Sequence, residues 1–190
     1  MFRFFERLID PYPETPPSMP PRRLLPFLHH YPRPVPPWLV LMSLLTAAIS
    51  VTEIMFFSFM GSLVDWLGDS DRTSFYADHG RALIGMGLLI LVGFPLLVLA
   101  QSLLVHQTIF GNFPMIARWQ THRYLLGQSM AFFQDEFAGR ISQKVMQTAL
   151  SIRETVVKLM DVFVYVLVYF TGAMVLVGRT DLWLMLPLVL

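Results

Sequence analysis

Two long stretches without charged side chains constrain this chain more than any other feature. Residues 82–110 contain no Asp, Glu, Lys or Arg, and residues 38–64 contain one such residue, Glu53. A helix needs ~20 predominantly apolar residues to cross a bilayer. Since a helix satisfies its own backbone hydrogen bonds in lipid, we predict one transmembrane helix at about 38–64 and a second at 82–110.

A third span, at about 156–177, is predicted to begin outside the membrane as an amphipathic helix. Apolar residues recur there at steps of three and four, and a similar pattern follows the second span. Neither stripe can be buried alone, so each is expected to pack on the other or on helices absent from this chain. The two stripes are Ile141, Val145, Ala149, Ile152, Val156, Leu159 and Phe163, and Met115, Trp119, Leu126 and Met130.

A fourth apolar run occupies residues 182–190, after a tight turn predicted at 178–181. Nine helical residues reach ~13 Å, less than half of a ~30 Å hydrocarbon core. Because a chain rarely ends inside a bilayer, we expect the sequence to be a fragment or the product of an early-terminated gene.

The composition indicates an all-α membrane protein and excludes several other classes. Of the 190 residues, 55% are hydrophobic and only 14% are charged. The net charge of +1 provides no basic field for a nucleic acid partner, and the absence of cysteine excludes disulfides and thiol catalysis. No phosphate-binding loop, hydrolase motif or metal-ligand spacing is present. We therefore predict no catalytic, cofactor-binding or metal-binding residue in this chain, and leave open whether it belongs to an enzyme.

Prolines predict irregular backbone at three places. Residues 1–21 form a proline-rich tail, of which residues 11–21 are expected to be extended or disordered. The short apolar segment at 22–31 is either solvated or lies on the membrane surface. Pro95 and Pro114 each remove a helical hydrogen bond, so bends are expected near these residues, the second close to Phe110.

Lysine and arginine counts predict the orientation. The tail at 1–37 has five, the region 112–158 has six, and the two other loops together have three. Cytosolic loops carry an excess of these residues, so the amino terminus and the loop at 111–155 are placed in the cytosol. The loop predicted at 65–81, on the other side, is short and acidic.

Three polar positions near the spans are candidate sites. Glu53 either contacts a cationic substrate or a proton in a cavity, or pairs with a polar residue of a neighbouring helix. His106 and its polar neighbours either line a water path or bond other helices. Lys158 and Asp161 are expected to form a local pair.

The segment at 132–145, FFQDEFAGRISQKV, is too polar for lipid and joins the two amphipathic helices. A short polar tip with aromatic side chains, held away from the membrane, suits docking to a soluble partner. The alternative is an ordinary helical hairpin whose phenylalanines, which are expected to end the first helix, pack on their own stems.

These residues resemble the transmembrane domain of ABC exporters of the multidrug and lipid type, over 22–190. The resemblance rests on the arginine-containing helix at 118–126, the aromatic pair Phe132–Phe133 and Gly139. It departs from the family at Pro114, Lys144 and Thr148. The resemblance implies that a coupling helix transmits nucleotide-driven motion; its residues would be Gln134, Asp135, Glu136, Phe137, Ala138 and Gly139.

The same resemblance implies a six-helix domain, of which this chain is part, and an elbow helix at 22–31. It further implies export of amphipathic or lipid-like substrates across a bacterial inner membrane. The partners would be a second half-transporter, identical or related, and a nucleotide-binding domain outside this chain that binds ATP and Mg²⁺. Two alternatives remain open: a small membrane bundle that docks a soluble partner, and an ion-coupled transporter that uses Glu53.

Overall fold

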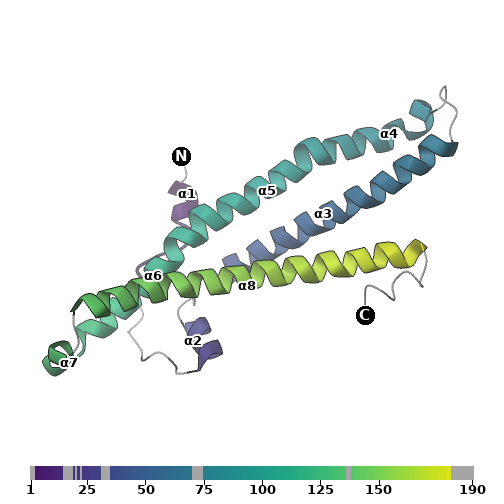
Figure 1. Ribbon diagram of the computed structural model, residues 1–190. Helices are drawn as coiled ribbons and strands as arrows, with labels where there is room; N and C mark the ends of the chain where they lie inside the picture. The colour runs from purple at the N-terminus through teal and green to yellow at the C-terminus, as the bar shows by residue number, and fades with distance from the viewer. Residues whose placement is uncertain are drawn as a thin grey trace. The chain divides into compact units, whose positions relative to one another are not determined.

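A computed structural model describes residues 3–14, 19, 21, 23–30, 35–69, 75–135 and 138–180. These residues form helices and irregular segments without a strand, so the predicted all-α class is confirmed for them. In chain order the helices are α1 (Arg3–Glu6), α2 (Leu24–His30), α3 (Pro36–Asp69), α4 (Phe75–Leu88), η1 (Leu89–Gly93), α5 (Phe94–Leu103), η2 (Leu104–Ile109), α6 (Phe110–Leu126), α7 (Met130–Asp135) and α8 (Ala138–Thr180). Figure 1 labels the α-helices.

Three helical stretches among the described residues are long and apolar enough to cross a membrane. They are Pro36–Gly68, Phe75–Leu126 and Gly139–Gly178, judged by length and composition. Each contains one of the three predicted spans. Large apolar side chains stay uncovered along them: Leu91 is 77% exposed and Ile84 is 66% exposed. Such faces suit lipid or further helices better than water.

The helices extend beyond the predicted ends of the spans. The predicted loop at 65–81 is wrong at both ends, because α3 continues to Asp69 and α4 begins at Phe75. The Trp66 and His79 rings stack with centroids 4.3 Å apart, which holds the two helix ends together. The turn predicted at 178–181 is also wrong as far as residue 180, since α8 runs through Thr180. The fourth run at 182–190 lies outside the described residues.

The irregularities predicted at Pro95 and Pro114 take the form of π-helical turns. Before Pro95, η1 shifts the register, so that the Phe94 N–H donates to the Leu89 carbonyl. Before Pro114, η2 does the same, and the Phe110 N–H donates to the Val105 carbonyl. A wide turn of this kind accommodates a ring that lacks an N–H. The helix therefore stays continuous from Phe75 to Leu126.

The chain divides into two compact units. The first contains Met1–Met42 and Ser102–Met160, and the second contains Ser43–Gln101 and Asp161–Leu190. In the first unit, α6 and the beginning of α8 form two stems that join at α7 (Figure 1). The buried apolar residues of the stems are Phe113, Ile116, Ala117, Ala149, Ile152 and Val157, and Ile109 is buried at the end of η2.

Within the described residues the two predicted stripes are covered only in part, and packing on helices outside this chain stays the alternative. Ala149 and Ile152 are buried as expected, but Leu159 and Phe163 are exposed. Leu126 and Met130 are also exposed, at 71% and 74%. The reason is that α6 ends at Leu126, whereas Met130 begins α7.

The proline-rich tail is fixed to the first stem. Residues 11–14 are irregular, as predicted, but Ile9 is only 2% exposed. Side chains of η2 and α6 donate to carbonyl groups of the tail at three successive places along the helix. These bonds are Thr108 Oγ1 to Phe5 O at 3.1 Å, Asn112 Nδ2 to Glu6 O at 3.0 Å and Trp119 Nε1 to Pro13 O at 3.3 Å. The carbonyls at the end of α1 and beyond it thus find donors on the stem.

In the second unit, α3 and α8 approach each other closely at Gly172. A Cβ atom there would overlap with Ile54 Cδ1 and lie 3.3 Å from its Cγ1. We expect Gly172→Leu to destabilise the protein by about 1–3 kcal/mol, because the helices must separate or Ile54 must leave its rotamer. Thermal denaturation in detergent would measure this effect. Gly61→Leu is the matched control, since a Cβ atom at that position on α3 would have nothing within 4 Å. Equal losses of stability in the two variants would contradict the prediction.

Candidate functional site

The tip between the stems contains a separate short helix. The first stem ends where the Gly127 N–H donates to the Tyr124 carbonyl, at 3.2 Å. Ser129 then precedes α7, and its hydroxyl accepts from the Phe132 N–H at 3.4 Å. Phe132 and Phe133 therefore lie in α7, so the expectation that they end the long helix is wrong.

The six predicted coupling residues lie at this tip, although the structure describes only part of them. Gln134 is exposed in α7, and Gly139 is exposed in the first turn of α8. The backbones of Asp135 and Ala138 belong to α7 and α8, while residues 136 and 137 lie outside the described part. Gln134 and Gly139 are thus free to touch a partner, and the coupling role of all six residues stays a prediction.

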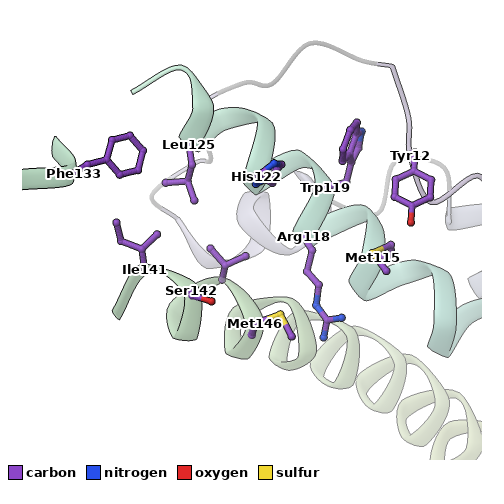
Figure 2. A pocket seen from close by; sticks show the side chains of 11 residues that line it. Tyr12, Met115, Arg118, Trp119, His122, Leu125, Phe133, Ile141, Ser142 and Met146 are labelled. Carbon is purple, nitrogen blue, oxygen red and sulfur yellow. The ribbon is translucent and has the colours of Figure 1, made fainter. Parts of the chain in front are cut away.

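A pocket of about 450 Å³ lies between the stems, next to the tip (Figure 2). Phe133 reaches it from α7 and Tyr12 from the tail. Phe133 is still 40% exposed, so both interpretations of the tip stay open. Arg118 extends from α6 toward α8, and its Nε is buried without a hydrogen-bond partner among the described residues. The other lining residues are Met115, Trp119, His122, Leu125, Ile141, Ser142, Val145 and Met146.

This pocket was not predicted from the sequence. Its walls are mainly apolar, and His122, Ser142 and Arg118 are polar. Only the Arg118 guanidinium is charged at every pH that a protein meets, so the pocket suits an apolar group with an anionic end. The amphipathic stripes indicated an apolar surface on the stems. Nothing in the sequence indicated that the tail supplies Tyr12 to the pocket, because a proline-rich segment carries no periodic pattern.

Glu53 bonds to a neighbouring helix, as one of its two predicted interpretations requires. Tyr165 of α8 donates from its hydroxyl to Glu53 Oε2 at 2.9 Å. The carboxylate also borders a second pocket, of about 440 Å³, whose other lining residues are Phe56, Phe57, Phe94, Tyr165 and Tyr169. The hydrogen bond orients the carboxylate, and the pocket leaves a cavity role available to it.

His106 and its polar neighbours do not form one continuous strip. His106 is exposed and contacts Ser102 of its own helix, with Nδ1 3.0 Å from the Ser102 carbonyl oxygen. Thr108 is fully buried and donates to the tail. Gln101 bonds to residues of other helices. These side chains have separate partners, and Gln101 and His106 make helix–helix and local hydrogen bonds, as one of the two interpretations predicted. A role for His106 in a water path stays a prediction.

A polar network that was not predicted from the sequence joins α3, α5 and α8. Thr46 Oγ1 donates to Asp161 Oδ1 at 2.6 Å, and Gln101 Nε2 donates to Thr46 Oγ1 at 2.7 Å. Gln101 Nε2 also lies 3.3 Å from Asp161 Oδ1. The predicted pair of Lys158 with Asp161 is wrong, as no such ion pair occurs among the described residues. Asp161 finds its donors across helices instead.

Metal binding has no support in the described part of the chain. No group of three or more His, Cys, Asp or Glu side chains there could hold a metal ion.

Two ring contacts stabilise the first stem. The Arg153 guanidinium lies 4.6 Å from the centre of the Phe110 ring, and Tyr12 meets Trp119 edge to face at 5.4 Å.

Comparison with known proteins gives one informative match. The whole chain is 44% identical, over 190 residues, to a Haemophilus influenzae protein described as an uncharacterized ABC transporter ATP-binding protein. The chain spans 31% of the length of that relative. No family model matches the chain. No solved structure matches it either.

Proposed function

We propose that this chain is the transmembrane, or permease, part of an ATP-driven ABC exporter. The observation that carries the proposal is the 44% identity, across the entire chain, to a protein described as an ABC transporter component. The three membrane-length helices and the paired stems support the same conclusion. ATP and Mg²⁺ would bind a nucleotide-binding domain outside these 190 residues.

In this proposal the spans form half of a six-helix domain, and a second half-transporter, identical or related, completes the pathway. The amino terminus and the tip face the cytosol, and the protein resides in a bacterial inner membrane. Amphipathic or lipid-like substrates would leave the cytosol through the spans. Residues 134–139 would contact the nucleotide-binding domain, and the stems would carry its motion to the membrane, because α8 runs without interruption from the tip to Thr180.

Reconstitution of the full-length protein tests this function. In proteoliposomes with a fluorescent phospholipid, we expect lipid movement between leaflets that requires ATP and stops with a non-hydrolysable analogue. The same preparation should hydrolyse ATP. ATP hydrolysis that moves neither the lipid nor any member of a panel of amphipathic dyes would contradict the exporter proposal.

A further inference from the structure

The pocket between the stems contains a charged side chain that lacks a partner in the described part of the chain. Arg118 extends from α6 toward α8 (Figure 2); its Nε is buried without a hydrogen bond, and it makes no ion pair with a described residue. Every lining residue belongs to the first compact unit, and none lies in a predicted span. We propose that this pocket binds an organic anion with an apolar body, and that Arg118 holds its anionic group.

The charge of the lining favours an anion. No Asp or Glu occurs among the described lining residues, so the guanidinium has no counter-charge in the pocket. Its donors form a planar fork that matches a carboxylate, phosphate or sulfonate. A buried donor without an acceptor costs free energy, and the cost is larger for a charged group. An anionic ligand would supply the acceptor and the counter-charge together, and His122 and Ser142 offer further donors.

The remaining walls suit the apolar body of such a ligand. Trp119 is fixed by its hydrogen bond to the Pro13 carbonyl at 3.3 Å and by its contact with the Tyr12 ring. Met115 and Met146 line the pocket as well, and methionine adapts to ligands of different shapes. A volume of about 450 Å³ is in the range of pockets for small organic ligands. The pocket therefore favours an amphiphilic anion over inorganic phosphate or sulfate.

A ligand of this chemistry has two sources, a soluble aromatic or fatty acid and an anionic phospholipid of the membrane. Arg118 follows the predicted end of the second span, at residue 110, by about 12 Å of helix. The guanidinium thus lies beyond the hydrocarbon core in the predicted topology, which favours the soluble acid. His122 and Ser142 are exposed, so the pocket is open to such a ligand.

Binding requires no ATP, so its test is independent of the proposed exporter function. The full-length protein in phosphatidylcholine nanodiscs, without nucleotide, is titrated with dansylglycine, whose fluorescence rises in an apolar site. Empty nanodiscs correct for the probe that enters lipid. We expect saturable binding, and about tenfold or more weaker binding of the neutral methyl ester, which cannot form a charge-assisted bond with Arg118.

The lipid composition identifies the source of the natural ligand. Weaker binding of dansylglycine in nanodiscs that contain phosphatidylglycerol would support the anion site and assign it to an anionic phospholipid. Unchanged affinity in these nanodiscs would support the anion site and assign it to a soluble acid.

Substitutions separate the contributions of charge and space. Arg118→Gln should weaken dansylglycine binding by about tenfold or more and leave the ester unaffected. Arg118→Lys keeps the charge but not the fork, so its loss should be smaller, roughly threefold. Ser142→Phe should weaken both probes, because it fills part of the pocket from an exposed position. Arg81→Gln is the control for removal of a charge: Arg81 is exposed on α4 in the other compact unit, and its loss should leave binding unchanged.

Three results would overturn the inference: no saturable binding to the unaltered protein, equal affinity for the acid and its ester, or unchanged affinity for the acid after Arg118→Gln. The first is also expected if another part of the full-length protein pairs with Arg118 and fills the pocket. The comparison of acid and ester needs no variant, so a folding defect cannot obscure it. If only the exporter proposal fails, the acid will still bind selectively, while ATP-driven lipid movement will be absent.

Discussion

Replacing Asp135, Glu136 and Phe137 together by alanine is expected to lower transport per ATP hydrolysed by about tenfold or more in the full-length protein. ATP hydrolysis should continue, since these residues hold no nucleotide in the proposed function. The loss is large because coupling between two sites is a free energy carried by their contact surface, and these residues make up half of that proposed surface.

Proteoliposomes that report lipid movement and phosphate release together give this ratio. Gln143→Ala with Gln147→Ala is the matched control, because both side chains are exposed on α8 a short distance from the tip. The control should keep the ratio of the unaltered protein. A triple variant with the same ratio would show that the tip is not the coupling element.

The main elements of the fold could be predicted from the sequence because lipid imposes a simple rule. Uncharged stretches of the necessary length can satisfy their backbone only as helices, so the three spans followed from residues 38–64, 82–110 and 156–177. Helix ends were harder to predict. The polar residues at 65–69 resembled a loop, yet they extend α3, since the stacking of Trp66 on His79 stabilises a helix end that sequence polarity argues against.

Contacts between distant residues could not be predicted from periodicity. Lys158 lies three residues before Asp161, so a local pair was the natural expectation. The carboxylate instead accepts bonds from Thr46 and Gln101, which are 115 and 60 residues away in the sequence. A single chain gives no signal for such a partner, because threonine and glutamine occur in many helices without one.

For the candidate sites, too, single residues could be predicted from the sequence, whereas their partners could not. Glu53 stood out because charge is rare in a span, and its position alone suggested a partner on a neighbouring helix. Which partner, and the aromatic pocket around it, depended on how α3, α5 and α8 pack. Likewise, the tail contributes Tyr12 to the stem pocket through carbonyl contacts, which side-chain patterns do not encode.

Thr46→Val is expected to destabilise the protein by about 1–3 kcal/mol, through loss of a buried hydrogen-bond network. Thr46 is 3% exposed, and its hydroxyl both donates to Asp161 and accepts from Gln101. Valine has the same shape, so packing is preserved. Asp161 Oδ1 would keep only the longer contact with Gln101, at 3.3 Å.

Thr52→Val separates this network from a general effect of removing a hydroxyl. Thr52 is also buried on α3, at 6% exposure, but its hydroxyl donates to the Ala48 carbonyl of its own helix. That carbonyl keeps its helical bond, so the control should cost less than about 1 kcal/mol. Thermal unfolding in detergent would compare the two variants. Equal melting temperatures of the Thr46→Val and Thr52→Val variants would mean that Asp161 is stabilised by something other than Thr46. A selective loss at Thr46 would establish that α3, α5 and α8 are joined by a charge-assisted contact, and hence that the helices forming the Glu53 pocket are fixed by hydrogen bonds as well as by packing.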